Sequence, residues 1–100
     1  MIALYLLRCR DGSYYVGSTR NLSERLLQHA SGKGSVYTST RLPVELVYVR
    51  ECATVVEAWA LERQVHGWSR AKRKALIAGS LELLPTLSRN RERREADEDG

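Results

Sequence analysis

Arg25 and His29 form the first pair in the chain whose residue types and spacing could do chemistry. They lie four positions apart beside Leu22 and Leu26, in a segment with the apolar spacing of a helix, so both project from one side of it. A guanidinium suits the oxygens of a phosphate, and an imidazole can hold or pass on a proton near neutral pH. As an isolated pair they are more simply a solvated arginine beside a partly buried histidine, so a site here needs further members.

Two tyrosines could be those further members, depending on the turn between them. Tyr5 and Tyr15 lie on two predicted strands joined by a segment that contains Asp11-Gly12, a strong hairpin signal. A two-residue Asp11-Gly12 loop would put the two rings on opposite faces of the sheet. A three-residue loop over 10–12 would put both rings on one face, beside Gly17, where a missing side chain gives space. The local sequence leaves both turns open.

Glu62 is the residue that could bring a metal ion into such a site. It lies in a predicted helix among Ala58, Leu61 and Val65, and a carboxylate in that setting ordinarily belongs to the polar face of the helix. It is also what Mg²⁺ or Mn²⁺ needs, because these ions take hard oxygen ligands and complete their shell with water and phosphate oxygens. Glu62 is therefore the candidate ligand for one divalent ion.

A few short elements must position these residues. Three segments have the composition of strands: 2–9, 14–18 and 44–52. Three helices are predicted, each between a capping residue and a glycine stop: Asn21 to Gly32, Thr54 to Gly67 and Ser69 to Gly79. Residues 31–43 are predicted as loop from their Gly, Ser, Thr and Pro content. We therefore expect an α/β (α+β) fold in the order ββαβαα, with a small three-stranded antiparallel sheet flanked by helices.

The charge distribution divides the chain into a basic domain, 1–87, and a charged tail, 88–100. The tail has no large apolar residue to offset the entropy of ordering, so we expect it to be disordered. It holds four arginines against five acids, so residues 1–87 carry a net charge of +5 within a total of +4. A basic body favours a polyanion such as nucleic acid as a partner, although moderate basicity alone is not specific.

The cysteines and the apolar runs limit the class of protein. Cys9 and Cys52 lie in apolar runs without the spacing of a zinc site, so we expect buried thiols. No apolar stretch reaches the roughly 20 residues that span a bilayer, and residues 2–7 are too short for the apolar core of a signal peptide. We expect a soluble, cytoplasmic protein.

Taken together, these motifs resemble the GIY-YIG nuclease superfamily, and most closely its small stand-alone bacterial subgroup of YhbQ-like proteins. The two name-giving motifs are present as Ala3-Leu4-Tyr5 and Tyr15-Val16-Gly17, with alanine and valine in place of the usual glycine and isoleucine. Ten residues separate the tyrosines, and ten more lead to the next family residue, a spacing typical of the family. The later family residues follow in order: Arg25, His29 and Glu62. The resemblance covers residues 2 to about 78.

The resemblance implies a metal-dependent endonuclease that hydrolyses DNA phosphodiester bonds, prefers particular DNA structures and is linked to DNA repair or recombination. It implies one Mg²⁺ or Mn²⁺ held by Glu62, and a tyrosine, Tyr5 or Tyr15, that takes the proton of the attacking water. Arg25 would stabilise charge on the phosphate, and His29 would orient the base or relay its proton. These five residues are expected to meet on one concave surface.

The expected partner is DNA, contacted by cations and an aromatic ring around this centre. The candidates are Lys33, Tyr37, Arg41, Arg70, Lys72, Arg73 and Lys74. A solvated helix face is the alternative for such a cluster. Phosphate contacts fix position without reading sequence, so we expect branched, nicked or single-stranded DNA as substrate and a protein partner as a source of specificity. We expect a monomer, and the alternative function is a non-catalytic nucleic-acid-binding module of the same fold.

Overall fold

The computed structural model describes residues 1–83 and confirms the expected fold class. One antiparallel sheet has the strand order β2-β1-β3, and helices lie on both sides of it. The strands are β1 (Ala3–Arg8), β2 (Tyr14–Thr19) and β3 (Glu45–Glu51). The helices are α1 (Leu22–Ala30), α2 (Val36–Ser39), α3 (Val55–His66) and α4 (Arg70–Ile77). The expected tail, 88–100, and residues 84–87 of the expected domain lie outside the described residues.

The loop between β1 and β2 has three residues, 10–12, and not the two of the alternative turn. The Cys9 N–H donates to the Ser13 carbonyl oxygen at 2.8 Å, which closes the hairpin at this pair. Gly12 has a left-handed φ of +87°, which suits glycine at the bulge position of such a loop. The Asp11 carboxylate accepts from the Ser13 N–H at 3.0 Å and holds the turn in this form.

This register places the two tyrosines of interest on the same face of the sheet. Tyr5 lies opposite Gly17 and Leu7 lies opposite Tyr15, and alternate residues of a strand share a face. Tyr14 consequently points to the other face, where the Arg70 guanidinium carbon lies 4.8 Å from its ring centroid. The turn that the sequence left open is therefore the one that brings Tyr5 and Tyr15 together.

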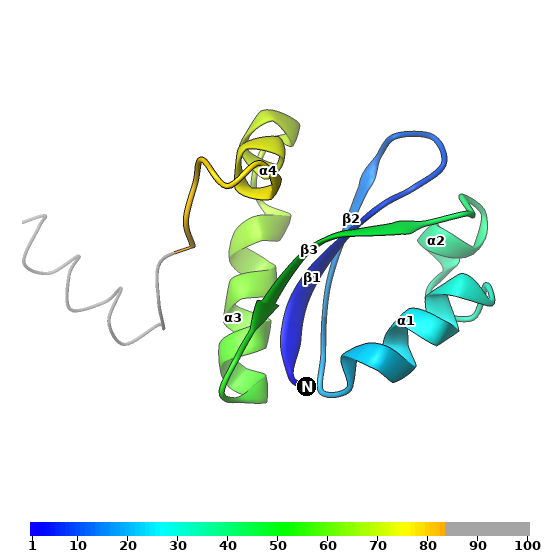
Figure 1. Cartoon of the computed structure of the whole chain (residues 1–100), viewed down its shortest axis with the longest axis horizontal. Coiled ribbons are helices and arrows are strands. Elements are labelled where there is room, and N and C mark those ends of the chain that lie inside the picture. Colours follow the sequence, from blue (N-terminus) through cyan, green and yellow to red (C-terminus); the bar gives the residue numbers. More distant parts are fainter. Residues whose placement is uncertain (84–100) are drawn as a thin grey trace, which may run out of the picture.

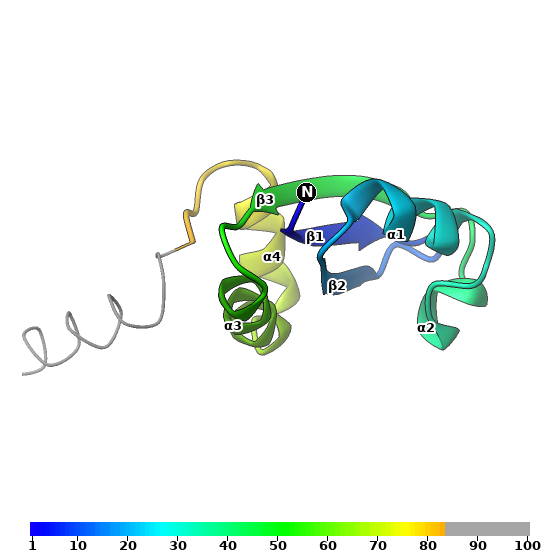
Figure 2. The ribbon, with the colours of Figure 1, turned by 90° about the horizontal axis from the view of Figure 1, so that it is seen from below.

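The sheet separates two apolar layers, and Figures 1 and 2 show α3 and α4 on one side of the strands and α1 and α2 on the other. The smaller layer, under α1, contains Tyr5, Leu7 and Leu22. β1 is buried on both faces because it is the central strand. The main core lies under α3 and α4 and is formed by Leu4, Leu6, Val16, Cys52, Ala58, Leu61, Val65, Leu76 and Leu83.

The three predicted helices begin at their predicted capping residues. In each, the capping side chain accepts a hydrogen bond from the N–H three residues on, as a helix N-terminus requires. The pairs are Asn21 with Glu24, Thr54 with Glu57 and Ser69 with Lys72. These caps fix where α1, α3 and α4 start and therefore which of their residues face the sheet.

α2 corrects the expectation that residues 31–43 are loop throughout. The Ser35 side chain accepts from the Thr38 N–H at 3.1 Å and starts a single helical turn. Four residues are too few to show an apolar period, so periodicity could not have indicated this turn. Its importance lies in the two side chains that it carries to the hairpin and to α1, those of Tyr37 and Thr38.

Two further expectations concern the cysteines and the membrane. Cys9 and Cys52 are free and buried, as the sequence indicates. Within residues 1–83 no helix is both long and apolar enough to cross a lipid bilayer.

Candidate active site

A buried hydrogen-bonded pair, Tyr5 from β1 and His29 from α1, lies at the centre of the candidate site. The Tyr5 hydroxyl and the His29 Nε2 atom are 2.8 Å apart, and the two residues are 1% and 0% exposed. The helix brings them together because Leu22, Leu26 and His29 recur at helical spacing on its sheet-facing side. His29 is thus more enclosed than the partly buried histidine that the sequence indicates.

The second ring nitrogen of His29 is also partnered. Its Nδ1 atom lies 2.9 Å from the hydroxyl of Thr38, which is fully buried. Gly34 packs its backbone against the imidazole, because a Cβ at this position would overlap the ring. Burial lowers the pKa of His29, and the nearby charge of Arg25 lowers it further. The ring is therefore neutral at pH 7, with one nitrogen a donor and the other an acceptor.

The partners of His29 indicate where the proton of Tyr5 lies. The Thr38 hydroxyl has two acceptors on Ser35, its Oγ atom at 2.9 Å and its carbonyl oxygen at 3.4 Å, and when it donates to either it accepts from His29 Nδ1–H. Nε2 then accepts from the Tyr5 hydroxyl, an assignment made from the hydrogen-bond partners. Burial raises the pKa of Tyr5 to about 12, although the nearby Arg25 guanidinium acts to lower this pKa. Tyr5 therefore holds its proton under ordinary conditions.

The raised pKa of Tyr5 predicts a loss of stability at alkaline pH. Because the folded protein favours the protonated phenol, this stabilisation is complete below the ordinary tyrosine pKa of 10.0 and is lost as pH rises through about 12. We expect the difference in unfolding free energy between wild type and Tyr5→Phe to shrink over this range. Urea unfolding below pH 10 and at about pH 11 measures it, since other groups titrate alike in both proteins. Parallel pH profiles would contradict the buried phenol.

Gly17 on β2 allows the aromatic rings to lie over the strand. A Cβ at this position would lie 2.6 Å from Cζ of Tyr5 and 3.1 Å from Cε2 of Tyr15. The ring centroids of Tyr5 and Tyr15 are 6.4 Å apart, and Tyr37 from α2 stacks on Tyr15 at 6.1 Å. Packing of the two rings therefore explains why position 17 is a glycine. Tyr37 from α2 completes a row of three tyrosine rings.

Arg25 connects the buried Tyr5–His29 pair with the protein surface. Its guanidinium approaches the hydroxyls of Tyr5 and Tyr15, and its Nη1 donates to Oε1 of Gln28 at 2.8 Å. The side chain lines a cleft of about 310 Å³ at the end of β2. The cleft is completed by Ser18, Thr19, Arg20, Gln28, Val55, Ala58 and Trp59, so it is shared between the β2–α1 turn, α1 and α3.

Glu62 approaches the same strand from α3. Its carboxylate accepts from the Ser18 hydroxyl at 2.5 Å, and Ser18 lines the cleft. Within residues 1–83 no group of three His, Cys, Asp or Glu side chains gathers into a metal site. One carboxylate and one hydroxyl at the border of an open cleft still fit an ion such as Mg²⁺, which keeps water and phosphate oxygens in its shell. Glu62 thus has the chemistry of a single protein ligand.

The five predicted site residues gather around β2 but do not all face one concave surface, which corrects that expectation. Tyr5 and His29 are buried behind Arg25. Tyr15 lines a second hollow, of about 320 Å³, which it shares with Tyr14, Val16, Tyr37, His66 and Arg73. Gly34 and Thr38 enclose the Tyr5–His29 pair, whereas Tyr15 lies on the edge strand β2, whose open edge is reached by side chains from both faces of the sheet.

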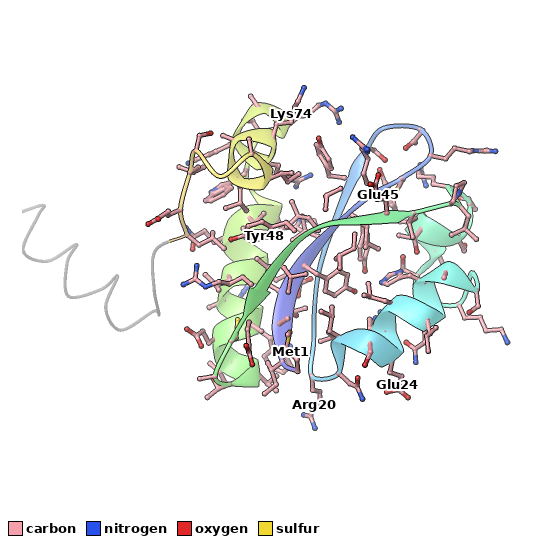
Figure 3. All side chains as sticks on the ribbon, viewed as in Figure 1. Met1, Arg20, Glu24, Glu45, Tyr48 and Lys74 are labelled. Atoms are coloured by element: carbon pink, nitrogen blue, oxygen red, sulfur yellow. The ribbon has the colours of Figure 1, made fainter. Side chains whose placement is uncertain are left out.

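Three of the predicted nucleic-acid contacts are exposed lysines. Lys33 follows α1, and Lys74 projects from the end of α4, as Figure 3 shows. Lys72 is also exposed, and its ammonium lies 4.8 Å from the ring centroid of Trp68. Within residues 1–83, this exposure leaves the three side chains open to a phosphate.

The other predicted contacts also bind within the protein. Arg41 pairs with Asp11 at 3.1 Å and lies 3.8 Å over the Tyr37 ring. Arg70 donates to the Gly12 carbonyl oxygen at 2.8 Å, and Arg73 donates to carbonyl oxygens at the end of α3. These three arginines therefore hold the hairpin loop and the α3–α4 junction in place, whatever else they contact.

Sequence reasoning missed several residues around the candidate site, among them Ser18, Gln28 and Thr38. Ser18 directly follows the second motif, and Gln28 follows Arg25 by three residues on α1, so position alone could have indicated both. Thr38 lies in the segment predicted as loop, and only its spacing from the capping residue Ser35 signals the turn that buries it.

Comparison with known proteins identifies the family and agrees with the fold. Residues 1–75 match the family model of the GIY-YIG catalytic domain. A UPF0213 protein of Bacillus pumilus is 47% identical over 73 residues, 73% of this chain and 74% of the relative. One of Streptococcus pneumoniae is 41% identical over 75 residues, 75% of this chain and 76% of the relative. The solution NMR structure of a UPF0213 protein from Bacillus halodurans aligns with a TM-score of 0.52 at 39% identity, covering 77% of this chain and 82% of that one. The chain therefore belongs to the GIY-YIG family of nuclease domains, among its small bacterial UPF0213 members.

Proposed function

We propose that this protein is a metal-dependent endonuclease that hydrolyses phosphodiester bonds in DNA and selects DNA structure rather than sequence. One arrangement carries the proposal: Arg25 lines the cleft at the end of β2, with Tyr5 and His29 hydrogen-bonded behind it and Glu62 reaching Ser18 from α3. A phosphate bound at Arg25 would thus lie close to hydroxyl groups on one side of β2 and to a carboxylate on the other.

The side chains around Arg25 have distinct roles in this proposal. The Arg25 guanidinium binds phosphate oxygens and stabilises the charge that develops on them. Tyr15 takes the proton of the attacking water, since its ring lines an open hollow and its hydroxyl adjoins Arg25. Tyr5, with its pKa of about 12, keeps its proton and serves with neutral His29 to position Arg25.

Glu62 would hold one Mg²⁺ or Mn²⁺ at the border of the cleft. A divalent ion supplies Lewis-acid stabilisation of the negative charge on the phosphate and on the leaving oxygen. The hydrogen bond from the Ser18 hydroxyl orients the carboxylate, as partners of ligating carboxylates commonly do. A second protein carboxylate is not required, because Mg²⁺ is often bound through one or two carboxylates together with substrate phosphates.

The open edge of β2 is the proposed path of the DNA strand. The two hollows lie at opposite ends of this strand, with Arg20 and Arg25 at one and His66 and Arg73 at the other. Cations placed in this way contact phosphates and carry no base readout. Nicked and branched DNA are therefore the proposed substrates, which connects the protein with DNA repair or recombination.

A cleavage assay on labelled DNA tests the proposed function. We expect nicked, flapped, branched or single-stranded DNA to be cut in Mg²⁺ or Mn²⁺, with little dependence on sequence, and to stay intact in EDTA. Cleavage that persists in EDTA would contradict the metal requirement. If DNA is bound in every buffer but never cut, the non-catalytic binding module is the better description.

A further inference from the structure

Trp59 on α3 is 60% exposed, more than Trp68 or any tyrosine of the described residues. Tryptophan is on average a highly buried residue type, so this exposure is unusual. The other tryptophan, Trp68, packs against the main core and carries Lys72 over its ring. Trp59 therefore contributes little to the apolar core, and its large flat face remains open to a ligand.

The position of Trp59 connects it with the candidate active site. It lines the same cleft as Arg25. It also lies one helical turn before Glu62 on α3, so Trp59 and Glu62 share a side of this helix. Arg20 lines the cleft from the turn between β2 and α1, from which it projects outward in Figure 3. The lining of this cleft, within the described residues, has two arginines and no acid.

An exposed ring beside cations is the arrangement that binds unpaired nucleotides. Cations follow the phosphates, while an aromatic face stacks on a base and tolerates any base type because every base has a π-face. Base pairs inside a duplex stack on one another, so a protein ring can stack on a base only where it is unpaired or extruded. The cleft offers both elements, and its aromatic ring, Trp59, lies one helical turn from Glu62.

We propose that Trp59 stacks on an unpaired base next to the phosphate that Arg25 binds. This inference rests on the proposed function and adds a substrate requirement to it: the nucleotide at the cleft must be unpaired, as in a single strand or a flap. A blunt duplex presents phosphates to Arg20 and Arg25 but no free base to Trp59.

Tryptophan fluorescence gives a direct test, because the chain has two tryptophans. In a Trp68→Phe, Glu62→Gln background in EDTA, Trp59 is the sole tryptophan and no cleavage occurs. We expect a single strand and a flapped duplex to quench its emission, and a blunt duplex of the same sequence to leave it nearly unchanged. Equal quenching by the blunt duplex would overturn the stacking proposal.

Binding affinities provide a second readout in otherwise wild-type protein. By fluorescence anisotropy in EDTA, we expect Trp59→Ala to bind single-stranded DNA on the order of tenfold more weakly and Trp59→Phe to retain most of the affinity. Val56→Ala is the matched control, because Val56 is 62% exposed on the same helix but does not line the cleft. Unchanged affinity in Trp59→Ala would also overturn the proposal.

The outcomes separate this inference from the proposed function. If DNA is bound and cut normally by Trp59→Ala, the endonuclease stands and the stacking role is wrong. If wild-type protein binds no DNA of any form, both are wrong, and the exposed ring belongs to some other contact.

Discussion

Glu62→Gln is expected to reduce DNA cleavage by about 10²- to 10³-fold, the loss that follows from removing several kcal/mol of metal-dependent charge stabilisation. Glutamine has the size of glutamate, and its side-chain carbonyl oxygen can still accept from the Ser18 hydroxyl. The fold and the shape of the cleft should therefore be retained. What is lost is the negative charge, which a hard divalent ion requires of its protein ligand.

The matched control for Glu62 is Glu57→Gln on the same helix. Glu57 accepts from the Ala53 N–H at 2.9 Å at the start of α3 and does not itself line the cleft. Its replacement costs a little stability and should leave cleavage unchanged. Cleavage rates are measured at rising Mg²⁺ concentration. We expect the difference in rate between wild type and Glu62→Gln to shrink as the weakened Mg²⁺ site of the variant is saturated. Full activity of Glu62→Gln at low Mg²⁺ would rule out a one-metal site at this carboxylate.

The elements of the fold could be predicted from local signals. Asn21, Thr54 and Ser69 each provide a side-chain oxygen for an otherwise unpaired N–H, and the structure uses all three. The hairpin turn was a harder case, because Asp11-Gly12 suits a two-residue loop as well. What holds the longer loop includes contacts from far along the chain: Arg10 N–H donates to the Arg41 carbonyl oxygen at 2.9 Å, and Arg70 reaches Gly12. Such contacts are not visible in a local sequence pattern.

The candidate site shows the same division between local and tertiary information. The spacing of Arg25 and His29 on α1 correctly predicted that they share a side of the helix. It could not predict that His29 would be fully buried, because the lid over this residue is formed by Gly34 and Thr38 in a segment without periodicity. Tyr5 is hydrogen-bonded to His29 and is buried with it, so two of the five predicted site residues lie beneath the surface.

Counts of basic residues were least informative about individual contacts. Arg73 looked like one more cation in a basic helix, yet it donates to carbonyl oxygens of Val65 and His66 at the end of α3. Helix ends leave carbonyl oxygens unpaired, and an arginine nearby in sequence can satisfy them. Charge therefore predicts the sign of a surface, whereas only the structure shows which cations are already engaged.

Arg25→Ala is expected to lower the cleavage rate by about 10²- to 10³-fold, as removal of one preformed charge-stabilising donor does. The effect should fall on kcat more than on KM, because the guanidinium acts chiefly on charge that develops during the reaction. Arg25→Lys keeps the positive charge but loses the planar fork that binds two oxygens and approaches both Tyr5 and Tyr15. We expect it to recover only part of the rate.

Arg20→Ala separates catalysis from simple attraction of DNA. Arg20 lines the same cleft but projects outward from the β2–α1 turn, where it can contact a neighbouring phosphate without supporting the tyrosines. We expect this variant to raise KM and to reduce the salt dependence of binding, with kcat nearly unchanged. If Arg25→Ala and Arg20→Ala alter kcat and KM alike, Arg25 contributes only attraction, and the role of the buried Tyr5–His29 pair in positioning it would have to be abandoned. If only Arg25→Ala lowers kcat, Arg25 differs from Arg20 in its role, as expected from the hydrogen-bonded Tyr5–His29 pair that lies behind Arg25 alone.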